Sequence, residues 1–510
     1  VGKSGPGKGT STTFAVGAFA GPWGGMSEDD YKERVLTAGR GLNETEMVDI
    51  AASEAGARFQ DLIDWGMTTK SAPGVFMALP KGDPGDRVPV WGREIVHTLV
   101  AKAEEVGVRF VNNLVVRSIA SGEDGVCLSA YGARQRQWFE LRGGAVILAA
   151  GGAGALFLHH DNPKRIGGDA HTLAYEAGCV MQDMEFVQFY PVAIAEPGKQ
   201  IFLIEPEGAD LGHLSNAVGE DILDKYNITV RPAATHARDA LSQALFQEIE
   251  EHDGAVYIDL THVTKEAWCA NPISATKWAY LDANYNAWKQ KLRVAPVAHF
   301  SGGGARTDAH GATNIPGLYA AGEAAGGMHG ANRMGGNALT ECLVFGRRAG
   351  LAATEFAEGK DKGVKAAAPA ALPETGEPQA DADALRAELC QIMWQYGGIR
   401  RDAAGLATGL EKIRAIAAQA TRTRGINEPR KLEKFLETQL AAGAAELIIQ
   451  AASRREESRG THARADFPTA DDANWRGHLK VVRQADGPDW WFDALAEDGA
   501  GDASNIQAAE

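Results

Sequence analysis

The stretch PVAHFSGGGARTDAHGATNIPGLYAAGEAAGGMHGANRMGGNALTECLVFGRRAG, which runs from Pro296 to Gly350, decides the fold that we predict for this chain. Its first part ends in three glycines at 302–304, which predict that a flat ligand lies against bare backbone, because no Cβ stands in the way. Residues 317–324 have the pattern of a short buried strand that breaks at Gly322. The Glu323 carboxylate follows at the strand's C-terminal end, a position suited to ribose or ribityl hydroxyls.

The last part of this stretch combines cationic side chains with the start of a helix. The run His329–Arg333 lies in a glycine-rich loop, and the pattern predicts a helix from Asn337 to Gly350. The positive N-terminal end of that helix would point back at the loop. Arginine, imidazole and helix N-terminus together predict a site for anions.

These spaced elements resemble the flavoprotein subunits of fumarate reductase and succinate dehydrogenase, and the related L-aspartate oxidases. In that family the corresponding segments form the flavin and dicarboxylate site. Loop punctuation alone would not explain an arginine and two histidines between the glycines. The matching residues are His299, Gly302, Gly303, Gly322, Glu323, Ala324 and the whole run His329–Arg333.

The resemblance implies an α/β fold made of an FAD-binding Rossmann-like domain, an inserted α+β capping domain and a C-terminal helical domain. We expect residues 1–184 and 296–358 to form the two parts of the FAD-binding domain, 185–295 the capping domain, 359–383 a linker, 384–486 the helical domain, and 487–510 an acidic tail that is disordered after Trp490–Trp491. The family's first βαβ unit, with its G-x-G-x-x-G turn for the FAD pyrophosphate, is missing. A truncated sequence is the simplest account.

Periodicity and turn residues predict the elements between these motifs. The expected elements are an amphipathic helical pattern over 27–66, a helix over 93–107, a small antiparallel layer over 111–141, a buried strand over 145–152, a helix that opens over 235–240 and ends near 251, a strand over 254–260, and helices over 384–455.

Composition narrows the class of protein. At 510 residues the chain should form two or three domains, and its net charge of −16 argues against nucleic acid or anionic membrane surfaces as partners. Its five cysteines have no C-x-x-C spacing, so no zinc site, other metal site or cysteine-ligated iron–sulfur cluster is predicted. No apolar run reaches membrane-spanning length. We therefore expect a cytoplasmic protein, without direct membrane insertion, that is soluble or attached to the inner face of a membrane only through partner subunits.

The resemblance also assigns residues to the cofactor, FAD. Ser11 stands where succinate dehydrogenases carry the histidine that binds FAD covalently, so we expect non-covalent FAD here. Asp169, in a turn that resembles the family's G-D-G turn, is a candidate FAD ligand, a helix N-cap, or both. The full set of cofactor-binding candidates is Thr10, Ser11, Thr12, Gly17, Gly151, Gly152, Asp169, Glu323, Asn337, Ala338 and Leu339.

The resemblance implies that His299 and Arg333 grip one carboxylate of a fumarate-like substrate while hydride passes between the flavin N5 atom and a substrate carbon. His329 is a further substrate-binding candidate, and so is Tyr190, which stands where the family has a histidine before proline. A tyrosine can still donate one hydrogen bond to a carboxylate. Tyr190 therefore keeps a substrate-binding role in this prediction.

Proton delivery depends on Arg238, which opens a predicted helix as the family's catalytic arginine does. An arginine is a poor acid in water, so it needs a desolvated site and a relay carboxylate, for which Glu205 or Glu207 is the candidate. The family's Thr-Glu pair aligns with residues 204–205, and the arginine expected three residues later is Gly208. The proton route therefore departs from the family's pattern.

The leading hypothesis is an FAD-dependent oxidoreductase that interconverts fumarate and succinate, or a similar acid pair, with catalytic residues Arg238, Glu205, His299 and Arg333. An L-aspartate oxidase is an alternative, because 340–344 resembles the corresponding helix of those enzymes. Tyr190 and Ile204 alter the distal pocket, so a reductase that acts on another enoic acid is a second alternative. A non-catalytic flavin-carrying subunit is a third. Electrons would come from a separate iron–sulfur or other electron-transfer subunit.

Overall fold

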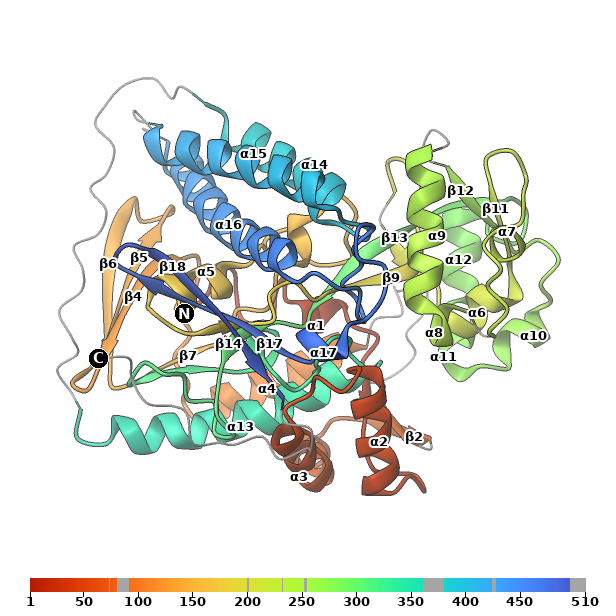
Figure 1. Cartoon of the computed structure of the whole chain (residues 1–510). Coiled ribbons are helices and arrows are strands. Elements are labelled where there is room, and N and C mark those ends of the chain that lie inside the picture. Colours follow the sequence, from red (N-terminus) through yellow and green to blue (C-terminus); the bar gives the residue numbers. More distant parts are fainter. Residues whose placement is uncertain are drawn as a thin grey trace.

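The computed structural model describes residues 1–72, 74–79, 91–199, 201–231, 233–251, 255–360, 380–423 and 428–495. Figure 1 shows a large mixed body, a layer of three long helices above it, and a smaller lobe to one side. The smaller lobe comes from the middle of the chain, and the three helices come from the C-terminal part. The predicted linker over 359–383 lies mostly outside the described residues.

The N-terminal part packs helices around a small antiparallel sheet of order β1-β3-β2. Its elements are α1 (Ser11–Phe14), β1 (Ala18–Ala20), α2 (Glu28–Ala38), α3 (Thr45–Asp64), β2 (Thr69–Ala72), β3 (Val75–Ala78) and α4 (Gly92–Glu105). The amphipathic helical pattern predicted over 27–66 is confirmed, and it forms two helices. Arg40 and Gly41 have φ angles of 57° and 72°, in the left-handed region, so the chain turns there and two helices form.

The next segment confirms the predicted antiparallel layer and leads back into the body. It contains β4 (Val115–Gly122), β5 (Gly125–Gly132), β6 (Gln137–Gly143), β7 (Val146–Leu148), α5 (Asp169–Glu176) and β8 (Met181–Gln182). Strand β7 pairs in parallel with β15 (Leu318–Ala320). The chain between these two strands includes the whole lobe. This parallel pair is the Rossmann-like element that the sequence predicted.

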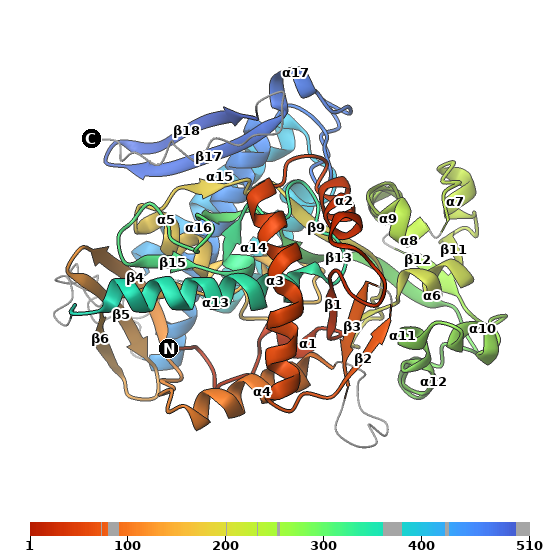
Figure 2. The same ribbon diagram turned by 90° about the horizontal axis from the view of Figure 1, so that it is seen from below.

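The lobe is built on a five-stranded sheet of order β10-β9-β13-β12-β11 with its own hydrophobic core. Its elements are β9 (Val187–Ile194), β10 (Phe202–Leu203), α6 (Pro206–Leu211), β11 (His213–Asn216), α7 (Ile222–Lys225), α8 (Ala233–His236), α9 (Arg238–Glu251), β12 (Val256–Asp259), α10 (Lys265–Cys269), α11 (Pro272–Ala275), α12 (Trp278–Tyr285) and β13 (Leu292–Ser301). The long strands β9 and β13 pair antiparallel and join the lobe to the body. Figures 1 and 2 show the lobe projecting beyond the body in both views.

After the lobe, the chain completes the body. It forms β14 (Gly304–Arg306), β15, a 3-10 turn over Gly322–Ala324, β16 (Ala325–Gly326) and α13 (Asn337–Ala357). Helix α13 begins where the sequence predicted and extends seven residues beyond the predicted end at Gly350. In Figure 2 it lies along one face of the body, beside α3.

The C-terminal part contributes α14 (Ala382–Gly397), α15 (Ala403–Arg422), α16 (Pro429–Arg454), α17 (Asp472–Trp475), β17 (Gly477–Gln484) and β18 (Gly487–Ala494). The predicted acidic tail over 487–510 is wrong in its first part, because β18 pairs with the whole of β17. Its aromatic residues explain the order: Phe492 packs against Trp475 at 5.3 Å, and Trp490 lies 4.3 Å from the Arg454 guanidinium. Residues 496–510 lie outside the described residues.

Strand β17 also enters the sheet of the body, whose order is β16-β14-β8-β17-β18. His478 on β17 is 2% exposed, and its Nδ1 lies 2.6 Å from Asp183 Oδ2. Burial opposes a charge on this imidazole, but Asp183 and Glu44 outweigh burial and the nearby Lys480, so the pKa of His478 is raised. A partly titrating ion pair therefore holds the C-terminal hairpin to the body.

We expect this pair to make stability depend on pH. A raised histidine pKa stabilises the fold fully below its unfolded value of about 6.5, and this contribution is lost as pH rises through the folded pKa. His478→Gln should therefore flatten the fall in unfolding free energy above pH about 6.5. Urea denaturation at a series of pH values measures it, with exposed His310→Gln as the control. An unchanged pH profile in His478→Gln would contradict this role.

A second buried network ties the C-terminal part to the start of the lobe. The Arg455 side chain is fully buried and contacts the carboxylates of Glu185 and Glu457, which are fully buried as well. Its remaining N–H groups donate to the carbonyl oxygens of Trp475 and Gly477, both at 2.9 Å. One guanidinium thus joins three segments that are distant in sequence.

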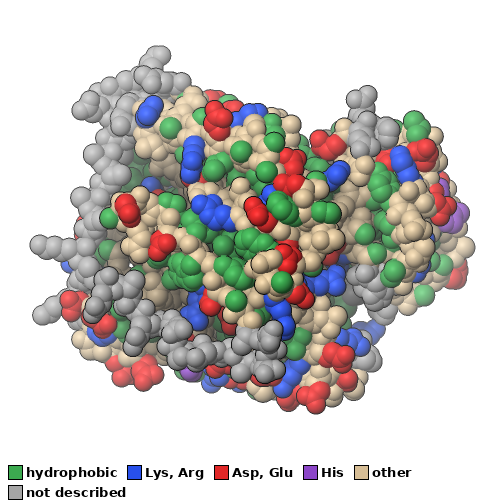
Figure 3. Space-filling model, viewed as in Figure 1, with side chains coloured by type: hydrophobic (Ala, Val, Ile, Leu, Met, Phe, Trp, Pro, Cys, Tyr) green, Lys and Arg blue, Asp and Glu red, His purple; other side chains and the backbone are tan. Residues whose placement is uncertain are grey.

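The described residues carry no helix long and apolar enough to cross a membrane, and no group of three or more histidine, cysteine or acidic side chains placed to hold a metal ion. The five cysteines are free thiols. Figure 3 shows acidic and basic side chains interspersed over the face seen there, with no broad basic patch.

Candidate active site

The three glycines at 302–304 lie against the protein's own backbone. A Cβ at Gly303 would stand 2.1 Å from the Asp183 carbonyl oxygen, and one at Gly304 would stand 2.6 Å from that of Ala324. Packing within the protein already requires these glycines, and the close-lying ligand stays a prediction. They are needed because β13 and β14 pass closely over neighbouring chain.

We expect Gly303→Ala to lower the free energy of unfolding by about 1–3 kcal/mol, the usual cost of overpacking a core. The new methyl group would meet backbone atoms, which cannot move aside as a flexible side chain can. Thermal or urea denaturation measures the loss. Gly335→Ala is the matched control, because nothing lies within 4 Å of a Cβ there. Equal stability of the two variants would contradict the packing argument.

His299 is held by groups that the sequence analysis missed. Its Nδ1 lies 2.6 Å from Asp161 Oδ2, and its backbone carbonyl accepts a hydrogen bond from Asn162 Nδ2 at 3.1 Å. Asn162 Oδ1 in turn accepts from the Ser11 hydroxyl at 3.2 Å. The Asn162 amide therefore links the segment that contains Ser11 to His299. Because Asp161 contacts Nδ1 of His299, Nε2 is the ring nitrogen left for a ligand.

Tyr190 and Arg238 stand beside this histidine. The Tyr190 and His299 rings lie 5.4 Å apart, and the Arg238 guanidinium lies 5.4 Å from the Tyr190 ring centre. The Tyr190 hydroxyl donates to the Ile204 carbonyl oxygen at 3.0 Å. This hydroxyl is therefore occupied by a hydrogen bond within the protein. The Tyr190 ring packs under Arg238.

Arg333 approaches from the loop before α13 and is 6% exposed. Its Nη2 donates to Gln188 Oε1 at 2.9 Å, Nη1 donates to the Met334 carbonyl oxygen, and the guanidinium lies 4.7 Å from the Phe300 ring. Burial, followed by repulsion from Arg238, lowers the pKa of Arg333 to about 10. Two arginines that repel each other in a buried place leave room for a negative charge between them.

His329 is less available than the sequence suggested. Its Nε2 lies 3.0 Å from Glu341 Oε2 on α13, and its ring packs edge-on against Phe300. Its Nδ1 is buried and has no hydrogen-bond partner among the described residues. One ring nitrogen thus remains for a ligand.

Glu323 occupies the end of β15, as predicted. Its Oε1 accepts a hydrogen bond from the Ser301 N–H at 2.9 Å, and a Cβ at Gly152 would meet the same oxygen. Burial raises the pKa of Glu323 to about 7, although the Ser301 N–H and the Arg333 charge act in the opposite direction. The carboxyl group therefore lies between two glycine-bearing strand ends, with little water around it.

Helix α13 begins beside these groups without a side-chain cap. Its N-cap is Gly336, in the left-handed region at φ 78°. Asn337 is fully buried; Tyr31 donates to its Oδ1, and its Nδ2 has no partner among the described residues. Ala338 is half-buried, while Leu339 packs into the core with Phe19. The helix thus presents free backbone N–H groups and one free amide at its positive end.

The remaining cofactor candidates divide into two places. Thr10 caps α1, where the Thr12 carbonyl oxygen packs tightly on Gly92, and Gly17 turns at φ 87° against Trp91. Asp169 lies elsewhere, paired with Lys3 at 2.8 Å. Its predicted role as N-cap of α5 is wrong, because Gly168 holds that position at φ 84°. Gly151, at φ 79°, turns the chain after β7.

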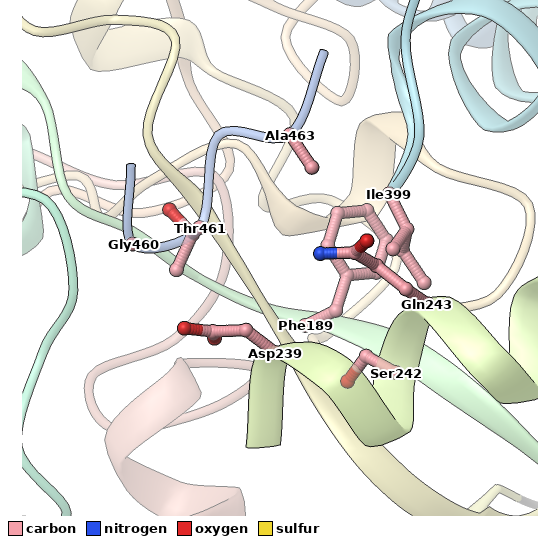
Figure 4. A pocket seen from close by; sticks show the side chains of 8 residues that line it. All are labelled: Phe189, Asp239, Ser242, Gln243, Ile399, Gly460, Thr461 and Ala463. Carbon is pink, nitrogen blue, oxygen red and sulfur yellow. The ribbon is translucent and has the colours of Figure 1, made fainter. Parts of the chain in front are cut away.

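A small cavity lies between α9 and the C-terminal loop that contains Thr461 (Figure 4). Asp239 and Ser242 reach toward that loop, and the volume of about 20 Å³ admits roughly one water molecule. The full lining is Phe189, Asp239, Ser242, Gln243, Ile399, Gly460, Thr461 and Ala463. This cavity lies where the lobe contacts the C-terminal part, and it is too small for a substrate.

Family profiles account for nearly the whole chain. The profile described as "FAD binding domain" matches residues 1–339, and the profile described as "Fumarate reductase flavoprotein C-term" matches residues 386–494. The chain belongs to the fumarate reductase and succinate dehydrogenase flavoprotein family. It is an oxidoreductase whose cofactor is FAD.

Individual members of this family align over most of the flavoprotein. One subunit of the fumarate reductase (CoM/CoB) of Methanothermobacter marburgensis is 30% identical over 485 residues, covering 90% of this chain and 87% of that one. The L-aspartate oxidase of Streptomyces coelicolor is 31% identical over 502 residues, covering 92% and 85%. FrdA of E. coli quinol fumarate reductase superposes with a TM-score of 0.82 at 26% identity, covering 97% and 91%.

The residues of this flavoprotein fit FAD by their own chemistry. Three polar side chains of this region have a buried atom without a partner among the described residues: His171 Nδ1, Asn337 Nδ2 and Arg333 Nε. His171 Nε2 lies 3.4 Å from the Glu323 carbonyl oxygen. Unpartnered buried groups are costly, so several in one region indicate a polar ligand. The uncapped start of α13 adds a place for negative charge.

Proposed function

We propose that this flavoprotein interconverts fumarate and succinate, or a closely similar pair of unsaturated and saturated carboxylic acids. The observation that carries the proposal is that Arg238 and His299, both half-buried, lie against the same Tyr190 ring, while the buried Arg333 is close enough for Arg238 to repel it. Two guanidinium groups and an imidazole fit a substrate with carboxylate groups better than they fit a neutral molecule. When bound, FAD supplies the hydride chemistry.

Each side chain has a role in this proposal. His299, oriented by Asp161, and Arg333, oriented by Gln188, would hold one carboxylate and fix the substrate's position. Arg238 would give a proton to the substrate carbon, or accept one in the reverse direction. The free Nδ1 of His329 would donate to or accept from the substrate at the edge of the site.

For the cofactor, we propose that FAD is held non-covalently. Glu323 would accept hydrogen bonds from its sugar or ribityl hydroxyls, and the start of α13 would stabilise negative charge. The proposed contacts come from Thr10, Ser11, Thr12, Gly17, Gly151, Gly152, Glu323, Asn337, Ala338 and Leu339. The Lys3 pair makes Asp169 the weakest of the original candidates.

The electron partner would be a separate iron–sulfur or other electron-transfer subunit. The methanogen relative is named as a subunit, and the described residues of this chain carry no group of metal-ligating side chains. Any attachment to a membrane, at its cytoplasmic face, would then run through that partner.

A test uses the flavoprotein with FAD bound, without oxygen. The flavin is reduced with dithionite, excess reductant is removed, fumarate is added, and the flavin absorbance is followed. We expect rapid reoxidation. A flavin that stays reduced with fumarate but is reoxidised by another enoic acid would show that the other acid is the substrate. A flavin that stays reduced with all such acids would overturn the proposal.

L-Aspartate oxidase activity is the second candidate. The Streptomyces relative with this name is as similar to the chain as the methanogen fumarate reductase subunit is. L-Aspartate added in air should then reduce the flavin and release hydrogen peroxide. Peroxide formation with aspartate, together with no reoxidation by fumarate, would favour this candidate.

A further inference from the structure

Position 208 cannot supply a cation to the relay carboxylate. A Cβ at Gly208 would lie 2.8 Å from the ring of Trp268, which is fully buried. The Trp268 Nε1 is fixed by a hydrogen bond to the Ser274 carbonyl oxygen at 2.6 Å. The space that a long side chain at 208 would need is therefore filled by an indole.

A lysine from another element reaches the same carboxylate. Lys277 stands at the start of α12 and is 3% exposed. Its Nζ donates to Glu205 Oε1 and, at 3.1 Å, to the Leu203 carbonyl oxygen, and it lies 4.9 Å from the Phe202 ring. A lysine this deeply buried needs a partner that keeps it charged, and Glu205 is that partner.

Glu205 has one oxygen left over. It is 6% exposed, and its Oε2 has no hydrogen-bond partner among the described residues. Burial raises the pKa of Tyr190, the Glu205 charge raises it further, and the Arg238 charge lowers it, so both charges act on one phenol. One oxygen of Glu205 thus belongs to Lys277. The adjacent residue, Ile204, accepts the Tyr190 hydroxyl, and Arg238 lies over the Tyr190 ring, so Tyr190 is the contact between the chain at Glu205 and the proton donor.

We propose that Lys277 is the positioning cation of the proton relay, acting through Glu205. This inference rests on the proposed function. In each reduction the substrate gains a hydride at one carbon and a proton from Arg238 at the next, forming two C–H bonds from one C=C bond. Glu205 then takes a proton from the Lys277 ammonium and passes it to Arg238, and solvent returns a proton to Lys277. Two electrons come from the reduced cofactor, so protons and electrons balance.

The kinetic test compares Lys277→Met with Lys277→Arg in the FAD-loaded protein. We expect Lys277→Met to slow reoxidation by fumarate roughly 100-fold with little change in KM, since general acid catalysis contributes about 10²–10⁴-fold. Lys277→Arg should recover most of the rate, and Lys289→Met, an exposed lysine of the same lobe, should match the unmodified protein. The rate of Lys277→Met should also rise more steeply as pH falls, because protons then reach the carboxylate without the lysine.

An infrared measurement tests the ion pair without turnover. Removing Lys277 takes away the ammonium group that contacts Glu205, so the infrared carboxyl bands should change in Lys277→Met, and this change should be missing from the double variant Lys277→Met/Glu205→Gln. The double variant removes both charges together, so it also serves if the single variant does not fold. Unchanged carboxyl bands in the single variant would overturn the pairing.

The outcomes separate the two proposals. If fumarate and related acids never reoxidise the flavin of the unmodified protein, the proposed function fails, and the relay fails with it whatever the infrared band shows. If the unmodified protein turns over and Lys277→Met, or the double variant, matches it, the relay fails and the function stands.

Discussion

Arg238→Ala should lower fumarate turnover by roughly 10²- to 10⁴-fold while FAD stays bound. The guanidinium lies over the Tyr190 ring, and its Nε donates to the Ala234 carbonyl oxygen at 3.3 Å. The side chain is half-buried, so its removal leaves little unsatisfied and the fold should remain. Stopped-flow reoxidation of the reduced flavin by fumarate measures the rate.

The matched control is Arg231→Ala in the same lobe. Its side chain is 45% exposed and stands 3.8 Å from Asp210, so its loss should leave the rate unchanged. The KM for fumarate gives a second readout. Without the Arg238 charge the site attracts an anion less strongly, so this KM should rise. An Arg238→Ala protein that reduces fumarate at the normal rate would remove this arginine from the mechanism.

Arg455→Ala should have the largest effect on stability, a loss of about 3–5 kcal/mol in the free energy of unfolding. The guanidinium has no exposed surface, and its removal leaves the Glu185 and Glu457 carboxylates buried with less compensation. Two backbone carbonyl groups lose their donors as well. Urea denaturation followed by fluorescence and circular dichroism measures the change.

Arg414→Ala is the control, because this arginine is 55% exposed and pairs with Glu446 at the surface. An exposed pair of this kind contributes about 1 kcal/mol or less. Adding Glu185→Gln to Arg455→Ala should recover part of the loss, since one buried charge is then removed. Equal losses in Arg455→Ala and Arg414→Ala would contradict a structural role for the buried network.

The sequence predicted what local motifs determine. His299, Glu323 and Arg333 lie in segments whose glycines, strand ends and helix start have fixed spacing, so one stretch of chain was enough to propose a shared site for them. The helix that was predicted to open at 235–240 and end near 251 was also found, although the structure divides its start between α8 and α9.

Partners that are distant in sequence were missed. Asp161 meets His299 across 138 residues, and Lys277 meets Glu205 across 72. Nothing in the residues around Lys277 marks it, because its role depends on the space that Trp268 fills beside Gly208. Strand β18 was missed for a related reason: its acidic, half-exposed residues look like a tail until β17 is known to lie beside them.

The place of β17 between β8 and β18 affects how the chain can fold during synthesis. Asp183 and Leu479, which hydrogen-bond across this junction, are 296 residues apart. While a ribosome is still adding the later domains, β8 has no neighbour on that side, and such an open edge can pair with another nascent chain. Contacts this distant also close slowly. A message truncated before residue 477 would therefore yield chains that aggregate or need a chaperone over β8.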